Sequence, residues 1–132
     1  MIFLDLDDFK PINDELGHAA GDSVLQEVSR RLCSCVRECD TVARLGGDEF
    51  LVLVTRVGAR EDLAVVARKL EEAVVQPIAV AGHPATHVTA SAGLATYEPG
   101  EAAEDLMNRA DHAMYRAKQA GVSGWEAFLA EA

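Results

Sequence analysis

Hydrophobic positions along the chain repeat with two periods, one typical of strands and one typical of helices. A short apolar run over residues 1–6 ends in acidic residues, as expected for a buried strand that delivers its C-terminal end to a site. Apolar residues at helical spacing predict helices over 21–32, 63–74 and 106–117. In the first helix, the pattern Ser23-x-x-Gln26 predicts a capping box.

Two glycine-containing turns divide the remaining strand-like segments. Residues 41–45 and 49–54 flank Gly46 and Gly47, a two-residue turn that predicts a β-hairpin with Asp48 and Glu49 at its tip. A second hairpin is predicted between 77–80 and 86–97, turned by residues 82–84. Strands and helices alternate without a regular βαβ period, which favours an α+β fold, with helices flanking a mostly antiparallel central sheet, over a doubly wound sheet.

Composition indicates one soluble globular domain. The length of 132 residues suits a single domain, and 49% hydrophobic with 26% charged residues excludes disordered and fibrous proteins. A net charge of −10 disfavours binding of polymeric nucleic acid or anionic membranes. Because no apolar run approaches the roughly 20 residues that span a bilayer and no secretory signal pattern is present, we expect a cytoplasmic location. The odd number and close spacing of Cys33, Cys35 and Cys39 indicate reduced thiols.

Two acidic clusters, at residues 5–8 and at Asp48 and Glu49, stand where strands are expected to end or begin. If the first strand lies beside the hairpin, Asp5 and Asp48 converge, and a divalent cation would stabilise their carboxylates. Oxygen ligands of this kind suit Mg²⁺ or Mn²⁺, which lower the pKa of a bound hydroxyl and brace the oxygens of phosphoryl transfer. The alternative is that these acids are solvated strand ends and turn formers.

Four sequence blocks resemble the GGDEF domains, the diguanylate cyclases of bacterial signalling, in the family's order. They are Asp5-Leu-Asp-Asp-Phe-Lys-Pro-Ile-Asn-Asp-Glu-Leu-Gly-His18 with Gly21-Asp22, then Arg44-Leu-Gly-Gly-Asp-Glu-Phe50, Val88-Thr-Ala-Ser-Ala-Gly-Leu94 and Ala110-Asp-His-Ala-Met-Tyr-Arg-Ala-Lys118. The resemblance implies a ferredoxin-like fold of the nucleotide-cyclase and polymerase-palm type. It also implies that two GTP condense into cyclic di-GMP across a homodimer, each 3′-hydroxyl attacking the α-phosphate of the other GTP.

The resemblance also assigns residues to metal and substrate. Two Mg²⁺ or Mn²⁺ per active site would be held by Asp5, the backbone carbonyl of Leu6, and Asp48. Asp48, helped by Glu49, would lie near the hydroxyl to be activated. The phosphates would contact Gly46 and Gly47, the backbone amides of Asp8 and Phe9, and the side chains of Lys10 and Lys118. Asn13 and Asp22 match the guanine-reading positions, and His18 matches the family's Gly-His pair.

Several of these residues also have an ordinary structural interpretation. Asp22 or Ser23 suits a helix N-cap, Asn13 suits a turn, and Lys10 alone would be a solvated lysine. For His18, we expect packing beneath the nucleotide loop rather than proton transfer. A carboxylate at Asp22 would accept from guanine N1–H and N2–H₂, a donor pair that adenine lacks, which argues against a metal-dependent nucleotidyl enzyme acting on ATP.

Arg37 and Asp40 resemble the family's Arg-x-x-Asp site for inhibitory product. An arginine fork can bind a phosphate or the guanine Hoogsteen edge, and a carboxylate can accept from the base. The plain alternative is an ordinary Arg–Asp pair at a helix end. A second function is therefore open, a non-catalytic module that binds cyclic di-GMP at Arg37 and Asp40, or GTP at the active site.

The chain departs from the family pattern at both ends. Val122 stands where a phosphate-binding arginine is expected. The family's opening helix is not found, so we expect one GGDEF domain over 1–132 that lacks its N-terminal helix and follows an upstream sensory domain in a longer protein. Residues 122–132 form a divergent tail, in which Trp125, Phe128 and Leu129 indicate an apolar face that docks on the domain or on a partner.

Overall fold

The computed structural model describes residues 1–120 and the backbone of 126–129. Strands and helices follow one another in the order β1 (Ile2–Asp7), α1 (Phe9–Leu16), α2 (His18–Cys35), β2 (Thr41–Gly46), β3 (Glu49–Leu53), α3 (Arg60–Val74), β4 (Ile78–Val80), β5 (His83–Thr86), β6 (Thr89–Leu94), α4 (Ala103–Gln119) and β7 (Glu126–Leu129). None of the helices in the described residues is long and apolar enough to cross a membrane.

Five strands form one sheet in the order β2-β3-β1-β6-β7, and β4 and β5 form a separate two-stranded sheet. The central strand, β1, runs antiparallel to both of its neighbours, β3 and β6. β2 is antiparallel to β3, and only the β6–β7 pairing in the described part of the chain is parallel. The predicted α+β fold with a mostly antiparallel sheet is confirmed.

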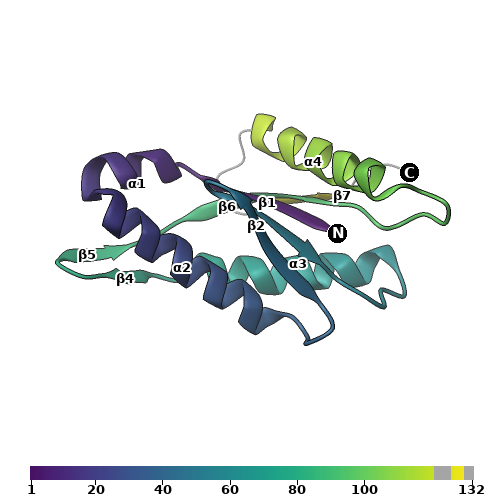
Figure 1. Cartoon of the computed structure of the whole chain (residues 1–132), viewed down its shortest axis with the longest axis horizontal. Helices are drawn as coiled ribbons and strands as arrows, with labels where there is room; N and C mark the ends of the chain where they lie inside the picture. Colours follow the sequence, from purple (N-terminus) through teal and green to yellow (C-terminus); the bar gives the residue numbers. More distant parts are fainter. Residues whose placement is uncertain (121–125, 130–132) are drawn as a thin grey trace.

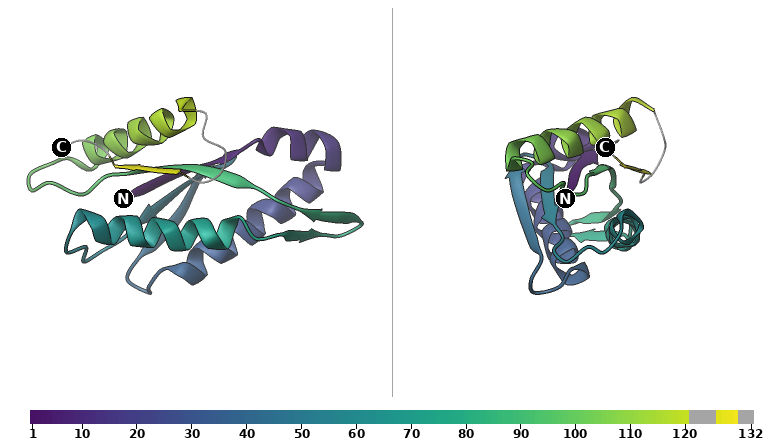
Figure 2. Two further views of the ribbon diagram at one scale, coloured as in Figure 1. Left: turned by 180° about the vertical axis from the view of Figure 1, so that it is seen from behind. Right: turned by 90° about the vertical axis from the view of Figure 1, so that its right-hand side faces the viewer.

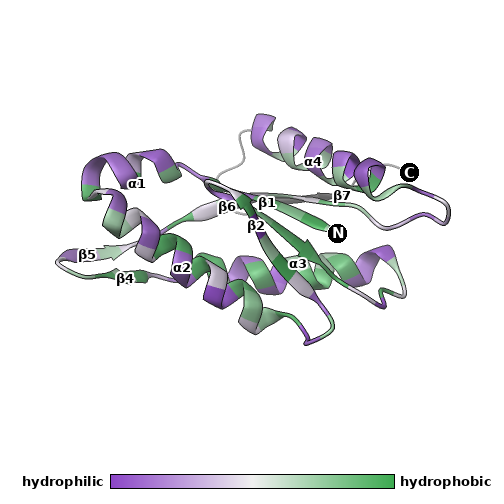
Figure 3. Cartoon of the chain, in the orientation of Figure 1, coloured by the Kyte–Doolittle hydropathy of each residue, from purple (hydrophilic) through white to green (hydrophobic). Residues whose placement is uncertain are grey.

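Helices cover both faces of this sheet, with α2 and α3 on one side and α4 on the other (Figures 1 and 2). Alternation along β1 supplies both layers, because successive side chains of a strand point to opposite faces. Ile2, Leu4 and Leu6 belong to the larger core cluster, which α2 and α3 complete. Phe3 belongs to the smaller cluster, with residues of α4. Figure 3 shows the strands as largely hydrophobic and much of α4 as polar.

Gly93 of β6 determines how closely α4 approaches the sheet. A Cβ atom at this position would collide with backbone atoms of Ala110 and Met114, which lie in the middle of α4. Only glycine therefore allows the helix to pack at this distance. One helical turn beyond Met114, the same close packing places Lys118 beside the C-terminal half of β1.

The start of α2 differs from the prediction. The helix begins at His18 rather than near residue 21, and Ser23 lies inside it, where its Oγ donates to the Ala19 carbonyl at 3.1 Å. The predicted capping box is therefore wrong, and so is the N-cap interpretation of Asp22. The expected packing of His18 beneath a loop is also wrong, because this side chain is exposed at the helix start.

The first predicted hairpin is confirmed, with a small shift of its turn. Gly46 pairs with Glu49 after an irregularity in β2, so the two-residue loop consists of Gly47 and Asp48. The second predicted hairpin is wrong in its partner: β4 pairs with β5, and β6 instead joins the main sheet beside β1. The turn therefore lies at Ala81 and Gly82. The predicted helices over 63–74 and 106–117 are confirmed as α3 and α4.

Candidate functional site

The C-terminal half of β1 and the tip of the β2–β3 hairpin form an acidic edge of the sheet. Asp5 pairs with Glu49 in the β1–β3 register, and the backbone N–H of Leu6 donates to the carbonyl of Asp48 at 3.1 Å. The expected pairing of the first strand with the hairpin is thus present, and it brings the carboxyl groups of Asp5 and Asp48 close enough to interact. Two acidic groups from distant segments meet at this edge.

Asp5 is incompletely satisfied in this environment. Its side chain is 17% exposed, its Oδ2 lies 3.1 Å from Nζ of Lys118, and its Oδ1 is buried without a hydrogen-bond partner among the described residues. Burial, together with the neighbouring Asp48, raises the pKa of Asp5 to about 6, although Lys118 acts in the opposite direction. A buried acceptor without a donor is costly, so this carboxylate favours a bound cation.

The acidic edge fits a divalent metal with oxygen ligands. No group of three or more His, Cys, Asp or Glu side chains suited to a metal ion occurs within the described residues. The oxygen atoms that could hold such an ion are the carboxylates of Asp5 and Asp48 and the nearby carbonyl of Leu6, the set that the family resemblance implies. The unpartnered oxygen of Asp5 and the like charge beside it are what Mg²⁺ or Mn²⁺ would satisfy, because such ions prefer oxygen ligands.

Asp7 belongs to the acidic cluster at residues 5–8, but the sequence assigned it no role at this edge. Its Oδ1 accepts from Oγ of Ser91 at 2.9 Å and lies 3.5 Å from Nζ of Lys118, while its Oδ2 accepts from Oγ1 of Thr89 at 3.1 Å. Lys118 therefore bridges Asp5 and Asp7. The signal that could have found Asp7 is its spacing, because residues two apart on a strand share a face.

The expected phosphate-binding residues lie around the start of α1 and the hairpin tip. Asp8, the residue before α1, has left-handed backbone angles (φ 53°, ψ 34°), a conformation that non-glycine residues seldom adopt and that often occurs at functional sites. Phe9 is buried, whereas Lys10 is exposed in the first turn of α1. Gly46 and Gly47 are exposed at the hairpin.

The expected guanine-reading residues, Asn13 and Asp22, lie on α1 and α2, which pack against each other. A Cβ atom at Gly21 would collide with the side-chain amide oxygen of Asn13, so glycine brings Asn13 against the residue that precedes Asp22. Asp22 is exposed and lines an open hollow of about 430 Å³ that extends to Arg44 of β2. Arg44 is a second residue that the sequence did not single out for this site, and its Nε donates to the carbonyl of Gly47 at 2.8 Å.

Arg37 and Asp40 form a tight network at the junction between α2 and β2. Oδ2 of Asp40 accepts from the backbone N–H and Nε of Arg37 at 2.9 and 3.2 Å, and Oδ1 accepts from the backbone N–H of Thr55 at 2.9 Å. Although burial acts against the charge, these donors hold the pKa of Asp40 at about 2. The Asp40 side chain is only 3% exposed, whereas that of Arg37 is 55% exposed and donates to the Thr55 carbonyl.

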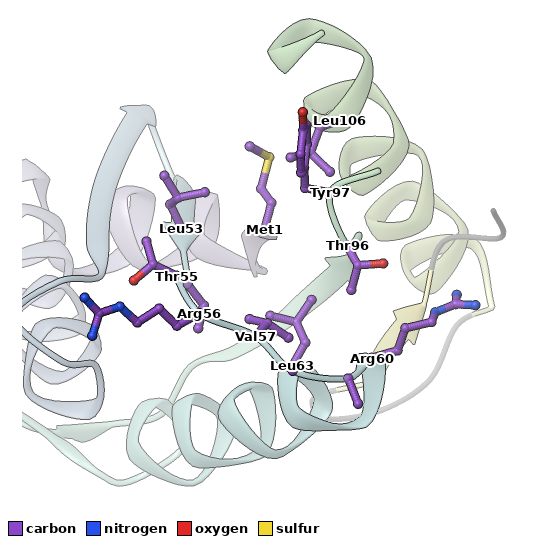
Figure 4. A pocket seen from close by; sticks show the side chains of 13 residues that line it. Met1, Leu53, Thr55, Arg56, Val57, Arg60, Leu63, Thr96, Tyr97 and Leu106 are labelled. Atoms are coloured by element: carbon purple, nitrogen blue, oxygen red, sulfur yellow. The ribbon is translucent and has the colours of Figure 1, made fainter. Parts of the chain in front are cut away.

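A cavity of about 620 Å³ lies at the opposite end of β1 from the acidic edge. Figure 4 shows Met1, Leu53 and Leu63 around the hollow, with the side chains of Arg56 and Arg60 extending away from it. The cavity contains none of the residues that the sequence suggests for chemistry, so it is separate from the site described above.

The tail carries two expectations that fall beyond the described residues. Val122 and Trp125 lie outside the part of the chain that the structure describes, as do the side chains of Phe128 and Leu129. The backbone of β7 is described and runs parallel to β6, with Ser91 opposite Glu126.

Comparisons with known proteins agree with the fold and with the motifs. Residues 1–123 match the family model described as diguanylate cyclase, GGDEF domain. The chain is 44% identical over 128 residues to the bifunctional diguanylate cyclase/cyclic di-GMP phosphodiesterase MucR of Pseudomonas aeruginosa, covering 95% of this chain and 18% of MucR. The chain thus spans less than a fifth of that relative's length.

Solved structures give the same result. The crystal structure of the GGDEF domain of TpbB (YfiN) from Pseudomonas aeruginosa superposes with a TM-score of 0.90 at 40% identity, covering 99% of this chain and 81% of the other. The GGDEF domain of DgcB from Caulobacter crescentus, solved in complex with c-di-GMP, superposes with a TM-score of 0.81 at 33% identity, covering 96% of this chain and 75% of the other.

Proposed function

The chain belongs to the GGDEF family of diguanylate cyclase domains, and on this premise we propose that it condenses two GTP molecules into cyclic di-GMP as one half of a homodimer. The observation that carries the proposal is the acidic edge, where Asp5 and Asp48 interact and one oxygen of Asp5 is buried without a partner among the described residues. Such an arrangement suits the binding of a metal and a nucleotide better than it suits a purely structural role.

The acidic edge would bind the reacting groups. Asp5, Asp48 and the Leu6 carbonyl are the proposed ligands of two Mg²⁺ or Mn²⁺, which would supply a lowered pKa for the 3′-hydroxyl and positive charge at the α-phosphate. Asp48, with Glu49 beside it in β3, would orient that hydroxyl. Each domain would hold one GTP, so the reaction needs two domains facing each other.

The rest of the site would bind the triphosphate and the base. Lys10, Lys118 and the first amides of α1 would contact the phosphates, where the unpaired N–H groups of a helix start favour anions. The exposed glycines of the hairpin leave its backbone accessible to the phosphates. Asn13 and Asp22 would read guanine, and the assignment of Asp22 gains support because its position inside α2 removes the N-cap alternative. His18, exposed at the start of α2, stays a proposed neighbour of the nucleotide.

The product would bind at Arg37. Its guanidinium is more than half exposed, so it can contact a phosphate or a guanine edge, while Asp40 holds the other side of the group. The structure of DgcB in complex with c-di-GMP shows that a similar GGDEF domain binds this molecule. Bound product at this position would regulate the domain rather than take part in the reaction.

The test is synthesis of cyclic di-GMP by the purified chain from GTP and Mg²⁺, followed by chromatography at several protein concentrations. We expect product, with a rate per domain that rises with concentration because two domains must meet. Asp48→Asn should lower the rate at least about 100-fold. Asp111→Asn is the matched control, since it removes the same charge from an exposed position of α4. A folded chain that makes no product at any concentration, or an Asp48→Asn variant with full activity, would contradict the proposal.

A further inference from the structure

Lys118 contacts two carboxylates of the acidic edge that differ in how completely they are hydrogen-bonded. Its Nζ lies between Asp5, at 3.1 Å, and Asp7, at 3.5 Å. Asp7 has two further donors from β6, the hydroxyls of Ser91 and Thr89, which fix both of its oxygens. Asp5 has Lys118 at one oxygen and no hydrogen-bond partner at the other among the described residues. One carboxylate is therefore a fixed anchor and the other is only half satisfied.

Asp7, the anchor, lies on a paired strand of the sheet. Asp7 pairs with Thr89 and Asp5 with Ser91 in the β1–β6 register, and Ser91 is 7% exposed. Lys118 reaches the same point from α4, whose distance from β6 is fixed at Gly93. Its side chain is 33% exposed, so Lys118 is only partly enclosed by the sheet.

From these contacts we propose that the ammonium of Lys118 takes the place of a divalent cation beside Asp5 in the nucleotide-free domain, and that Asp7, held by Ser91 and Thr89, is the positioning residue for Lys118. The inference rests on the proposed function for the identity of metal and nucleotide. A divalent ion at Asp5 repels the ammonium at this distance. Lys118 then remains tethered to Asp7 and is available to a triphosphate, whose negative charge offsets that repulsion.

The consequence is a coupling between the two ligands. Lys118 weakens the binding of metal alone, and it strengthens the binding of metal together with a nucleotide. Removing its charge should therefore shift the two affinities in opposite directions, a result that simple loss of structure would not produce. This opposite shift distinguishes the inference from an ordinary phosphate-binding role of Lys118, which predicts weaker nucleotide binding and unchanged metal binding.

The experiment measures binding by calorimetry, with Mn²⁺ alone and then with 3′-deoxy-GTP in the presence of Mn²⁺. This nucleotide lacks the attacking hydroxyl, so no turnover is needed. For Lys118→Met, we expect Mn²⁺ alone to bind about tenfold more tightly and the nucleotide about tenfold more weakly. Lys118→Gln should show the same two directions if the first variant does not fold. Arg116→Met removes the same charge from an exposed position of α4 and should leave both affinities near those of the unmodified chain.

A double-mutant cycle tests the positioning role of Asp7. Ser91→Ala leaves every charge in place and removes one of the two hydroxyls that fix Asp7. It should weaken nucleotide binding about threefold in the unmodified chain and have no effect in the Lys118→Met chain. An equal loss in both backgrounds would overturn the positioning role.

The outcomes separate this inference from the proposed function. Unchanged or weaker Mn²⁺ binding in both Lys118 variants would overturn the inference, even if the chain synthesises cyclic di-GMP. Opposite shifts in a chain that makes no cyclic di-GMP would support the inference and count against the proposed function alone. Absence of Mn²⁺ binding in every variant would overturn the inference together with the proposed metal site.

Discussion

Asp5 and Asp40 both stand beside a basic side chain, yet their environments are opposite in kind. Asp40 receives backbone and side-chain donors at both oxygens, and its pKa falls to about 2. Asp5 has an unpartnered buried oxygen among the described residues and a second carboxylate beside it, and its pKa rises to about 6. An ion pair alone therefore does not indicate what a carboxylate does in this fold.

The difference lies in which groups surround the pair. Arg37 in the turn after α2 and Thr55 after β3 supply N–H donors to Asp40, so its negative charge stabilises the folded state. The end of β1 gives Asp5 a like charge and a low-dielectric environment, so its negative charge costs stability in the absence of an added cation. We infer that the Asp40 carboxylate stabilises the fold, whereas the Asp5 carboxylate serves to bind a ligand.

The largest expected effect is a loss of activity without a loss of stability when Asp5 is changed. Asp5→Asn should lower cyclic di-GMP synthesis at least about 100-fold, because a proposed metal ligand is lost. The free energy of unfolding should not fall, and we expect a rise of up to about 1 kcal/mol because the charge that is removed is unfavourable in the folded state. Activity assays and urea denaturation, with Asp111→Asn as control, measure the two effects. A clear loss of stability would contradict the comparison.

The next largest effect is a loss of stability when Asp40 is changed. Asp40→Asn should lower the free energy of unfolding by about 2 kcal/mol at pH 7, because several donors lose a charged acceptor. The pKa of Asp40 is lower in the folded protein, about 2 against an ordinary 3.8, so its contribution is complete above about pH 4 and is lost as the pH falls towards 2. Urea denaturation of both chains between pH 7 and pH 2 should show the difference shrinking. A difference independent of pH would contradict the role of the charge.

The smallest effect on stability is expected at Arg37. Arg37→Ala removes an exposed guanidinium, but Asp40 keeps its backbone donors, so the free energy of unfolding should fall by less than it does in Asp40→Asn. The same change should abolish cyclic di-GMP binding at the proposed product site, which calorimetry measures directly. For this site, Arg37→Ala is therefore a cleaner variant than any change at Asp40. Unaltered product binding would place the site elsewhere.

The sequence allowed prediction of the parts of the fold that depend on local patterns. Helical periodicity identified α3 and α4, and the glycine pair before Asp48 identified the β2–β3 hairpin. The approach of Asp5 to Asp48 followed from placing one apolar strand beside that hairpin. These inferences needed only the spacing of residues within a segment and one assumption about pairing.

What could not be predicted depends on contacts between distant segments. Thr86 and the residues after it look like one continuous strand in the sequence. In the structure the β4–β5 pairing ends at Thr86, and the next strand, β6, pairs with β1 instead. Ser23 resembles an N-cap, but α2 begins earlier, at His18, and packs against α1 at Gly21. Asp7 acquires its role only through β6 and α4, and its partners lie far along the chain.

The close packing of α4 at Gly93 also bears on the order in which the molecule forms. Asp5 and Asp7 belong to the first strand, and Lys118 arrives with a helix from the other end of the sequence. Contacts of such long range form late, because closing a large loop costs entropy before the contact can stabilise it. Until α4 docks, the two neighbouring carboxylates therefore lack the charge of Lys118. Docking of α4 completes the smaller core and brings the ammonium of Lys118 to this acidic edge in the same step.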